Sequence, residues 1–537
     1  MKPPRKEPRI RKPRRERKPL LTADSFARLD RSAILVFISL FCLVHWAIRV
    51  FIAPVYTVEE AEQILMSQTM QAGYEARQPP MLAWLFGIAI QNGGVNPPIV
   101  FAVKYLLMAI GLMFYYLAAR NVLTKPGVSA AAVAAWALTY YIGWAVHEDL
   151  LGGVALFAVL AITLHALTRI LTWRRQRDWF YLGMAIGAGL LTHHLYVIFP
   201  VSMFAAMIIT GFFRGALNPV RLILAIIVAA VIYGWYAFWV FTHGGEVVRV
   251  WNEFGATWAD RPAWLERVQN GGLSLIRALL EFTLPLSLFW LMLYWPLWLP
   301  ILYPVFPRRS TDEEQHEAAW RRLFFLSTLI AASMYLIGLV MGVETFRGYW
   351  MLPVLFTAPI WMFSHVKRAG EFPIATRAFA AVAGLFVLFV IGGRFVEWRG
   401  DIEHCDSCRP YTPFAQWASD LTRKGFKPAP NAQSPGTIVT DDRFLGGNMK
   451  GVFPKARVMD ASLSPNAFPP PSGFGLCLAV WTGSPAMPDA LYDYLKNELH
   501  APPHDKGLED TSRGVFTLSN RETRLYFQFV PRGDGCR

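Results

Sequence analysis

Acidic side chains are concentrated in one short stretch of this sequence. Glu59, Glu60 and Glu62 lie within the segment TVEEAEQILMSQTM, directly after the first long apolar run. A carboxylate at a boundary between water and membrane can accept a proton from a hydroxyl or stabilise a developing positive charge. The same glutamates could equally form the solvated face of an amphipathic helix in the interface. Their spacing alone leaves both interpretations open.

Two further polar turns separate apolar runs. The first is the HED turn at 147–149, where Asp149 could serve chemistry at the membrane edge or could simply cap a helix. The second is the HHLY turn at 193–196. A histidine there can hydrogen-bond a phosphate, but it is charged only near or below a pH of about 6.5. A structural histidine held by backbone groups is the alternative for at least one of His193 and His194.

Basic residues accompany these acidic turns. Arg77 lies in the same loop as the glutamates, Lys104 lies near the start of the next apolar run, and Arg347 precedes Tyr349 and Trp350. An arginine can hold a phosphate through two parallel hydrogen bonds, and the aromatic rings could stack on a sugar or an isoprenoid. Alternatively, the lysine could snorkel to the interface and the aromatic pair could belong to an interfacial belt.

Long apolar runs dominate the first three-quarters of the chain. Of its 537 residues 54% are hydrophobic and only 17% are charged, below the roughly 25% charged residues of soluble domains. Runs near the roughly 20 residues that cross a bilayer must be helical, because backbone in hydrocarbon has to satisfy its own hydrogen bonds. We predict eleven spans, at about 33–53, 97–119, 127–146, 150–171, 179–193, 195–213, 219–241, 276–304, 322–342, 349–366 and 376–393.

The charges predict an orientation. The first 18 residues hold ten Lys and Arg, and every second connection between runs is also basic, which is typical of cytoplasmic segments. We therefore expect a basic cytoplasmic tail at 1–31, a membrane domain at 32–393 with exported loops at 54–96 and 242–275, and an exported domain at 394–537. The net charge of +14 could also indicate nucleic-acid binding, but no basic module or aromatic platform follows the tail.

The segment after residue 394 has a different composition. Short β-like runs at 436–440, 476–481 and 524–530 alternate with helical stretches, so we predict a small α/β domain. An oxidising compartment favours two disulfides, with three possible pairings, among Cys405, Cys408, Cys477 and Cys536. The CDSC spacing could also be a metal or redox pair, but no second CxxC or nearby histidine pair completes a zinc site. We predict no metal site.

The first exported loop resembles the loop signature of the GT-C membrane glycosyltransferases, which use polyprenyl-phosphate sugars. That signature has the form D-E-A-E/Y-x-x-x-W-S followed by G-Y-x-x-x-P-P-L-x-A-W. These enzymes include the aminoarabinose transferases of lipid A, bacterial galacturonosyl and mannosyl transferases of envelope glycans, and the protein O-mannosyltransferases. The matching positions are Glu59, Glu60, Ala61, Glu62, Ser67, Gly73, Tyr74, Pro79, Pro80, Leu82, Ala83 and Trp84.

The resemblance, together with the charges above, implies a set of site residues. We expect Glu59, Glu60 and Asp149 to be catalytic. We expect the donor phosphate to be bound by Arg77, Lys104 and Arg347. Contacts to the donor or acceptor are expected from Glu62, Tyr74, His193, His194, Tyr196, Tyr349 and Trp350.

The sequence departs from the resembling family at two places. Glu59 stands where the family has Asp, and its extra methylene moves the carboxylate by about 1.5 Å, enough to alter the donor, the acceptor or the rate. His193 and His194 stand where relatives often have a Ser-Lys pair.

The resemblance implies an all-α polytopic membrane domain of GT-C type, with about eleven transmembrane helices, joined to an exported α/β domain. We expect an inverting glycosyltransferase of the bacterial inner membrane that moves a sugar from a polyprenyl phosphate to lipid A or lipopolysaccharide core. No cofactor is expected to be essential, although the carboxylates could bind a divalent cation, and no nucleic-acid partner is expected. The alternatives are a protein O-mannosyltransferase, a non-catalytic scaffold, and a transporter or flippase of lipid-linked sugar, which should carry charges near the bilayer midplane.

Overall fold

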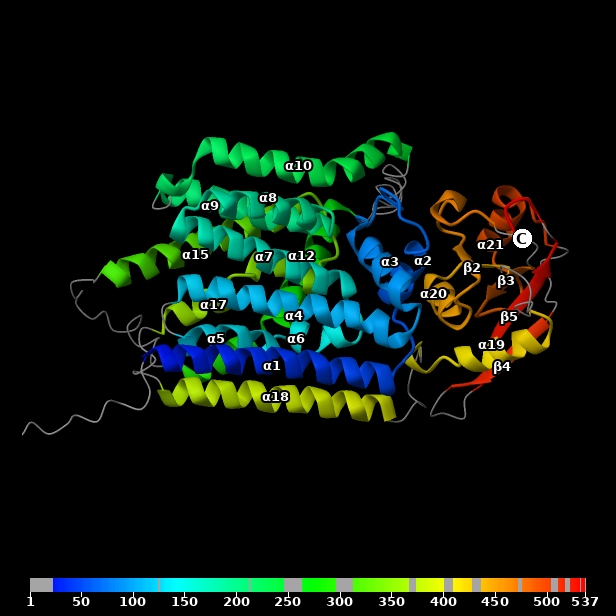
Figure 1. Cartoon of the computed structure of the whole chain (residues 1–537), viewed down its shortest axis with the longest axis horizontal. Helices are drawn as coiled ribbons and strands as arrows, with labels where there is room; N and C mark the ends of the chain where they lie inside the picture. Colours follow the sequence, from blue (N-terminus) through cyan, green and yellow to red (C-terminus); the bar gives the residue numbers. More distant parts are fainter. Residues whose placement is uncertain are drawn as a thin grey trace, which may run out of the picture.

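The computed structural model places a helical bundle at one end of an elongated molecule and a sheet domain at the other (Figure 1). Two short helices of the loop at 54–96, predicted to be exported, lie between them. The structure describes residues 23–123, 126–211, 214–245, 263–295, 312–366, 373–399, 409–426, 436–471, 476–503, 510–516, 522–531 and 533–536.

Among the described residues, six helices of the bundle are long and apolar enough to cross a membrane, and they run roughly parallel in Figure 1. The most deeply buried of the six is α7, because its sequence is apolar on every face and neighbouring helices cover it. A multi-pass membrane protein is therefore confirmed. The six helices are α1 (Ala23–Phe51), α4 (Pro97–Val122), α7 (Leu151–Trp173), α10 (Pro219–Thr242), α15 (Asp312–Val340) and α18 (Pro373–Arg399).

The other predicted spans are shorter or interrupted, so the count of eleven is not confirmed. The expected span at 127–146 is a chain of short pieces: α5 (Pro126–Ala134), η1 (Ala135–Leu138), α6 (Tyr140–Gly143) and η2 (Ala145–His147). The expected spans at 179–193, 195–213 and 349–366 contain α8 (Gln176–Leu190), η3 (His194–Val197), α9 (Ile198–Thr210), η6 (Gly348–Met351), α16 (Leu352–Leu355) and α17 (Ala358–Ser364).

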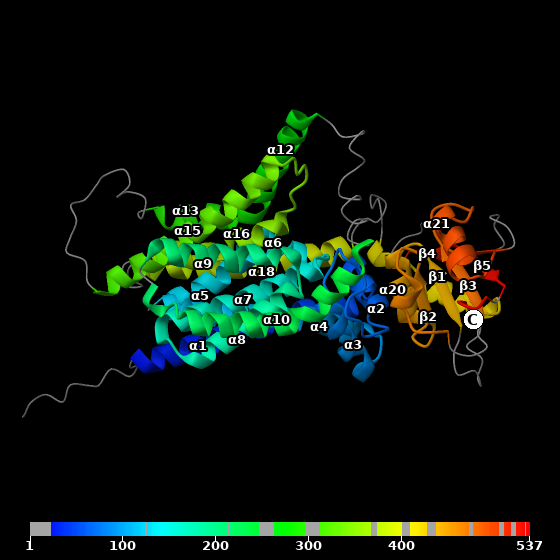
Figure 2. The same ribbon diagram turned by 90° about the horizontal axis from the view of Figure 1, so that it is seen from above.

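The region of the eighth predicted span differs most from expectation. Helix α12 (Trp264–Thr283) begins well before residue 276, because its first half is amphipathic and a search for apolar runs misses it. It tilts away from the bundle (Figure 2). A break at Leu284-Pro285 separates α12 from α13 (Leu286–Leu293), and the end of the expected span at 296–304 lies outside the described residues.

The C-terminal domain contains one five-stranded mixed sheet in the order β2-β1-β3-β5-β4. The central strand β3 pairs parallel to β1 and antiparallel to β5. The strands β1, β2 and β3 are buried along their whole length, as expected of a sheet covered on both faces. The strands are β1 (Thr437–Thr440), β2 (Arg457–Asp460), β3 (Cys477–Trp481), β4 (Asp510–Val515) and β5 (Glu522–Val530), with helices η8 (Arg409–Tyr411), α19 (Phe414–Arg423), α20 (Arg443–Val452), η9 (Pro465–Ala467), α21 (Asp489–Asp493) and η10 (Tyr494–Glu498).

One of the expected disulfides is present. Cys477 and Cys536 are bonded and join β3 to the end of the described chain. The other two candidates, Cys405 and Cys408, lie outside the described residues.

The loop at 54–96 folds into α2 (Val58–Met66) and α3 (Met81–Gly93), which separate the bundle from the sheet domain (Figure 1). A capping box starts α2: the side chain of Thr57 accepts from the Glu60 N–H, and the Glu60 carboxylate accepts from the Thr57 N–H. The acidic cluster of this loop is therefore on a helix with defined inner and outer faces. This helix packs along α20 of the sheet domain.

Candidate active site

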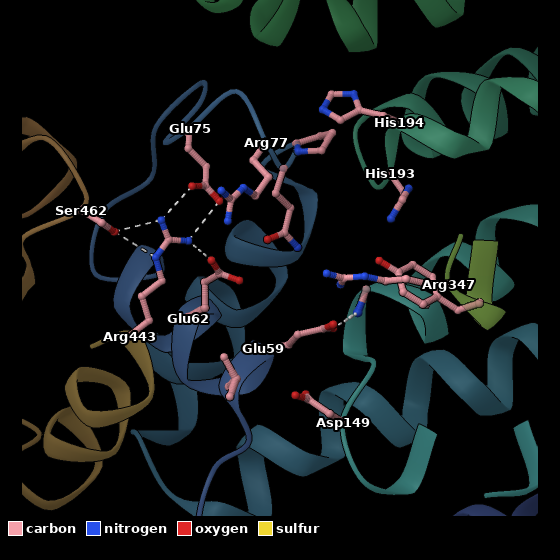
Figure 3. Close-up of a pocket in the computed structure, with 16 residues that line it drawn as sticks. Glu59, Glu62, Glu75, Arg77, Asp149, His193, His194, Arg347, Arg443 and Ser462 are labelled. Carbon is pink, nitrogen blue, oxygen red and sulfur yellow. Dashed lines mark hydrogen bonds and ion pairs between the residues drawn. The ribbon is translucent and has the colours of Figure 1, made fainter. Parts of the chain in front are cut away.

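A pocket of about 540 Å³ lies where the bundle, the loop at 54–96 and the sheet domain meet. Charged side chains from all three parts point into it (Figure 3). Its lining comprises Val58, Glu59, Glu62, Glu75, Arg77, Gln78, Pro79, Asp149, Gly152, Gly153, His193, His194, Arg347, Tyr349, Arg443 and Ser462.

Two carboxylates face this pocket from the N-terminal ends of two helices. Glu59 lies in the first turn of α2, and Asp149 closely precedes α7. The N–H of Gly152 in α7 donates a hydrogen bond of 2.8 Å to Glu59 Oε2, and a helix N-terminus favours negative charge. This bond fixes the Glu59 carboxylate near Asp149 (Figure 3).

Burial raises the pKa of both acids, and the charge of Asp149 raises the pKa of Glu59 further. Burial, followed by the charge of Asp149, raises the pKa of Glu59 to about 7, although the Gly152 N–H and Lys104 act in the opposite direction. Burial likewise raises the pKa of Asp149, although the charge of Lys104 opposes this. A carboxyl group that titrates near neutrality can act as a general base at physiological pH.

Glu60, the next residue on α2, points into the bundle instead. Its Oε2 lies 2.8 Å from Arg49 of α1, and its Oε1 lies 3.8 Å from Lys104 of α4, with all three side chains buried. Burial alone would raise the pKa of Glu60, but these two cations outweigh it and hold the pKa below its usual value. Lys104 also donates a hydrogen bond of 2.7 Å to the Asp149 carbonyl. These bonds connect α1, α2, α4 and the turn before α7.

Cations and an aromatic ring line the side of the pocket facing the carboxylates. Arg347 extends toward Glu59 (Figure 3), and its guanidinium forms no hydrogen bond or ion pair with another described residue. Tyr349 lies next to it, with its ring edge-on to His193 at a centroid distance of 6.1 Å. Arg77 enters from the loop between α2 and α3. An unpaired guanidinium beside a partly apolar wall is suited to bind an anion.

The histidine pair has a readable hydrogen-bond pattern. The Leu195 N–H donates to His193 Nδ1 at 3.1 Å, so the proton of the neutral ring is on Nε2 and can be donated. His194 Nε2 lies 3.1 Å from the Ala76 carbonyl, which connects this turn to the loop that carries Arg77. Both histidines line the pocket. They can offer neutral hydrogen bonds where a lysine would offer a charge.

Five of the predicted site residues do not line the pocket. Glu60 and Lys104 neutralise each other behind it, because each is buried beside the other's charge. The hydroxyl of Tyr74 donates to a carbonyl of its own loop, and Tyr196 is fully buried with its hydroxyl on a threonine of α7. Trp350 packs against the bundle core and does not line the pocket, whereas its neighbour Tyr349 does.

The pocket wall also contains Arg443, which is not among the predicted site residues. Arg443, the first residue of α20, contacts Glu62 and Glu75, and Ser462 accepts hydrogen bonds from the same guanidinium. Glu62, expected to contact the donor or the acceptor, lines the pocket and is held there by a protein partner. Nothing in the DDRFLGGN turn that contains Arg443 indicates a contact with residues some 370 positions earlier.

A search of the described residues for three or more His, Cys, Asp and Glu side chains able to hold one metal ion finds no such group. The carboxylates of the pocket are arranged instead around hydrogen-bond donors and cations of the protein.

The Glu60 cluster predicts a marked difference between two glutamate substitutions. Glu60→Gln leaves Arg49 and Lys104 buried without their counter-ion and is expected to lower the free energy of unfolding by about 3–5 kcal/mol. Glu281→Gln, the matched control, disrupts an exposed pair with Arg277 and is expected to cost under about 1 kcal/mol. Thermal unfolding of the detergent-purified variants measures both, and equal melting temperatures would contradict the structural role of Glu60.

Comparison with known proteins gives matches to glycosyltransferases. The family model described as dolichyl-phosphate-mannose-protein mannosyltransferase matches residues 77–239. The lipopolysaccharide core galacturonosyltransferase RgtA of Rhizobium johnstonii is 26% identical over 447 residues, covering 81% of this chain and 84% of that protein. RgtB of the same organism, with the same description, is 25% identical over 484 residues, covering 88% and 92%.

Solved structures support the same fold. The apo structure of ArnT from Cupriavidus metallidurans superposes with a TM-score of 0.52 at 14% identity, covering 93% of this chain and 98% of that one. Its structure bound to undecaprenyl phosphate gives a TM-score of 0.50, also at 14% identity, with 94% and 98% covered. Together the comparisons show a membrane glycosyltransferase whose fold is similar to that of ArnT and whose sequence at 77–239 is similar to protein mannosyltransferases.

Proposed function

We propose that this enzyme transfers a sugar from a polyprenyl phosphate to the lipopolysaccharide core at the exported face of the bacterial inner membrane. One observation carries the proposal: a pocket beside the membrane bundle that sets two weakly acidic carboxylates against an unpaired guanidinium. The names of the relatives RgtA and RgtB favour the core over lipid A as acceptor. The basic segments at the other end of the bundle support an N-terminus in the cytoplasm.

The donor phosphate is assigned to Arg347. Its guanidinium has no partner among the described residues and is directed into the pocket, so it can accept the phosphate without breaking an existing ion pair. As the glycosidic bond breaks, negative charge accumulates on the departing lipid phosphate, and a nearby fixed cation stabilises it. Tyr349, adjacent to Arg347, provides a ring for the sugar or the first isoprene unit.

The proton acceptor is assigned to Glu59. The acceptor hydroxyl attacks the anomeric carbon from the side opposite the phosphate, the bond to the phosphate oxygen breaks, and the hydroxyl proton passes to the Glu59 carboxylate. The reaction inverts the anomeric configuration because a single displacement occurs. Asp149 keeps the pKa of Glu59 high, and its own charge stabilises the positive charge that develops on the sugar ring. No step in this scheme requires a cofactor.

The transferred sugar is assigned as a uronate, in line with the galacturonosyl transfer named for both relatives. A uronosyl donor carries a carboxylate as well as a phosphate, so two anions must be accommodated. Arg347 and Arg77 both reach the pocket, and His193 adds a neutral N–H donor to the same wall. A site for a cationic aminosugar would need the opposite charge at one of these positions.

Mass spectrometry of envelope glycolipids tests the proposed function. Cells that lack the protein, or that carry Glu59→Gln, are expected to lose one uronate-sized increment from the lipopolysaccharide core, because the amide cannot accept a proton. Wild type and Glu281→Gln should retain it. An unchanged core in the deletion strain would contradict the assignment, and loss of the increment from lipid A alone would move the acceptor to lipid A.

The titration of Glu59 predicts the pH dependence of the reaction. The base acts only when it is deprotonated, so kcat/KM should rise with pH and level off above a midpoint near 7, following the pKa of Glu59. Initial rates with purified enzyme and a polyprenyl-phosphate uronate, measured at constant ionic strength, give the profile. A profile that falls through this range, or stays flat, would exclude Glu59 as the base.

A further inference from the structure

The sheet domain contributes a side chain to the pocket from a distant part of the sequence. Arg443 begins α20, the helix that packs along α2, and its guanidinium reaches the carboxylates of the first exported loop. We propose that Arg443 is a positioning residue that holds this loop in the shape needed for transfer. The expected effect on the rate of transfer rests on the proposed function, whereas the expected effect on the order of the loop does not.

The hydrogen-bond donors of Arg443 are occupied by protein groups. One terminal nitrogen contacts Glu62 and lies 3.2 Å from Glu75 Oε1, while the other lies 2.9 Å from Glu75 Oε2. The Nε atom lies 3.2 Å from Ser462 Oγ and 3.9 Å from Asp460 Oδ1. A guanidinium whose donors are all engaged in this way has little capacity to bind a substrate anion. Arg347, on the other side of the pocket, has no partner among the described residues and retains that capacity. The contacts of Arg443 indicate a role within the protein.

The two glutamates held by Arg443 belong to different parts of the loop: Glu62 lies on α2, and Glu75 lies in the segment between α2 and α3. Glu62 is one turn after Glu59 on α2, and Glu75 lies two residues before Arg77. A single guanidinium therefore fixes the distance between the helix carrying the base and the segment carrying a pocket arginine. Paired hydrogen bonds to a carboxylate fix orientation as well as distance.

The position of Arg443 is itself fixed by close contact between α20 and α2. A side chain at Gly447 would place its Cβ only 2.3 Å from the Ala61 carbonyl oxygen, so only glycine permits this approach. Asn448 accepts from the Tyr56 N–H at 2.9 Å and donates to the Tyr56 carbonyl at 3.1 Å. The helix that carries Arg443 is thus also bonded to the backbone at the start of the first exported loop.

Removal of the guanidinium would leave like charges facing one another. Glu62, Glu75 and Asp460 all contact it, and their carboxylates would then repel. We expect the segment before Arg77 to move away from α2 in response. The arginine of the pocket and the base would then be displaced relative to each other, and a displacement near 1 Å can cost on the order of a hundredfold in rate.

The test compares four full-length variants with wild type in nanodiscs. They are Arg443→Ala, Arg443→Lys, Glu75→Ala and the double variant Arg443→Ala/Glu75→Ala. Arg423→Ala is the control, because this exposed arginine pairs with Asp420 of the sheet domain and does not line the pocket. Hydrogen–deuterium exchange of residues 67–80 reports the loop directly, and kcat and KM with a polyprenyl-phosphate uronate report the reaction.

Arg443→Ala should speed exchange of residues 67–80 by about tenfold or more and lower kcat by about 10- to 100-fold, with a smaller change in the donor KM. Lysine should restore part of both. The double variant should be no worse than Arg443→Ala, because the two residues act through one contact. Arg423→Ala should match wild type in both measurements.

Three outcomes would overturn the proposal. Unchanged exchange in Arg443→Ala would show that the contact does not order the loop. A loss of rate in Arg443→Ala with wild-type rate and exchange in Glu75→Ala would indicate that Arg443 acts by a direct contact with substrate and not through Glu75. Faster exchange in Arg443→Ala throughout the sheet domain, and not chiefly in residues 67–80, would indicate unfolding of that domain. The exchange measurement does not use the sugar donor, so its result holds even if the enzyme transfers a different sugar. Failure of the proposed function would appear instead as absence of activity of the wild type with the uronate donor.

Discussion

The arrangement of the site depends on one buried carboxylate, Glu60. Two buried cations from different helices, Arg49 and Lys104, hold it, and its own backbone and side chain complete the capping box that begins α2. Because successive residues on a helix point about 100° apart, anchoring Glu60 in the bundle turns Glu59 toward the pocket. The lysine also binds the Asp149 carbonyl, so the same cluster places both pocket carboxylates.

Such a cluster is costly to bury unless every charge is compensated. Here the compensation comes from three separate helices, so it forms only when α1, α2 and α4 are assembled correctly. The neighbouring Glu59 has a different environment. It accepts a hydrogen bond from a helix N-terminus and lies near a second acid, but it forms no ion pair with a described residue. Adjacent glutamates therefore differ in pKa and in role because of the partners around each one.

Much of this could be predicted from sequence. Apolar runs identified the membrane bundle, and the composition after residue 394 identified a mixed α/β domain. The loop motif led to Glu59, and the other polar turns and basic residues led to Arg77, Asp149, Arg347 and Tyr349; all five line the pocket. Hydropathy could not locate the broken spans, since an interrupted apolar run has the same composition as a continuous helix.

The remaining features depend on tertiary contacts that sequence spacing does not encode. Glu59 and Glu60 are equivalent in a motif, and only the cations brought by α1 and α4 distinguish them. Lys104 was expected at the phosphate because it is basic and near the exported end of its helix, yet its helix turns it toward Glu60. The contact of Arg443 with Glu75 joins two domains across most of the chain, and no local pattern signals it.

A cryo-electron microscopy structure of the enzyme with bound polyprenyl phosphate would test the central claim most directly. The account predicts phosphate density within hydrogen-bonding distance of Arg347, on the side of the pocket that faces Glu59 and Asp149, with the isoprenoid chain leading toward the bundle. Phosphate bound away from Arg347, with the pocket between α2 and α20 empty, would contradict the assignment of this pocket as the site of transfer.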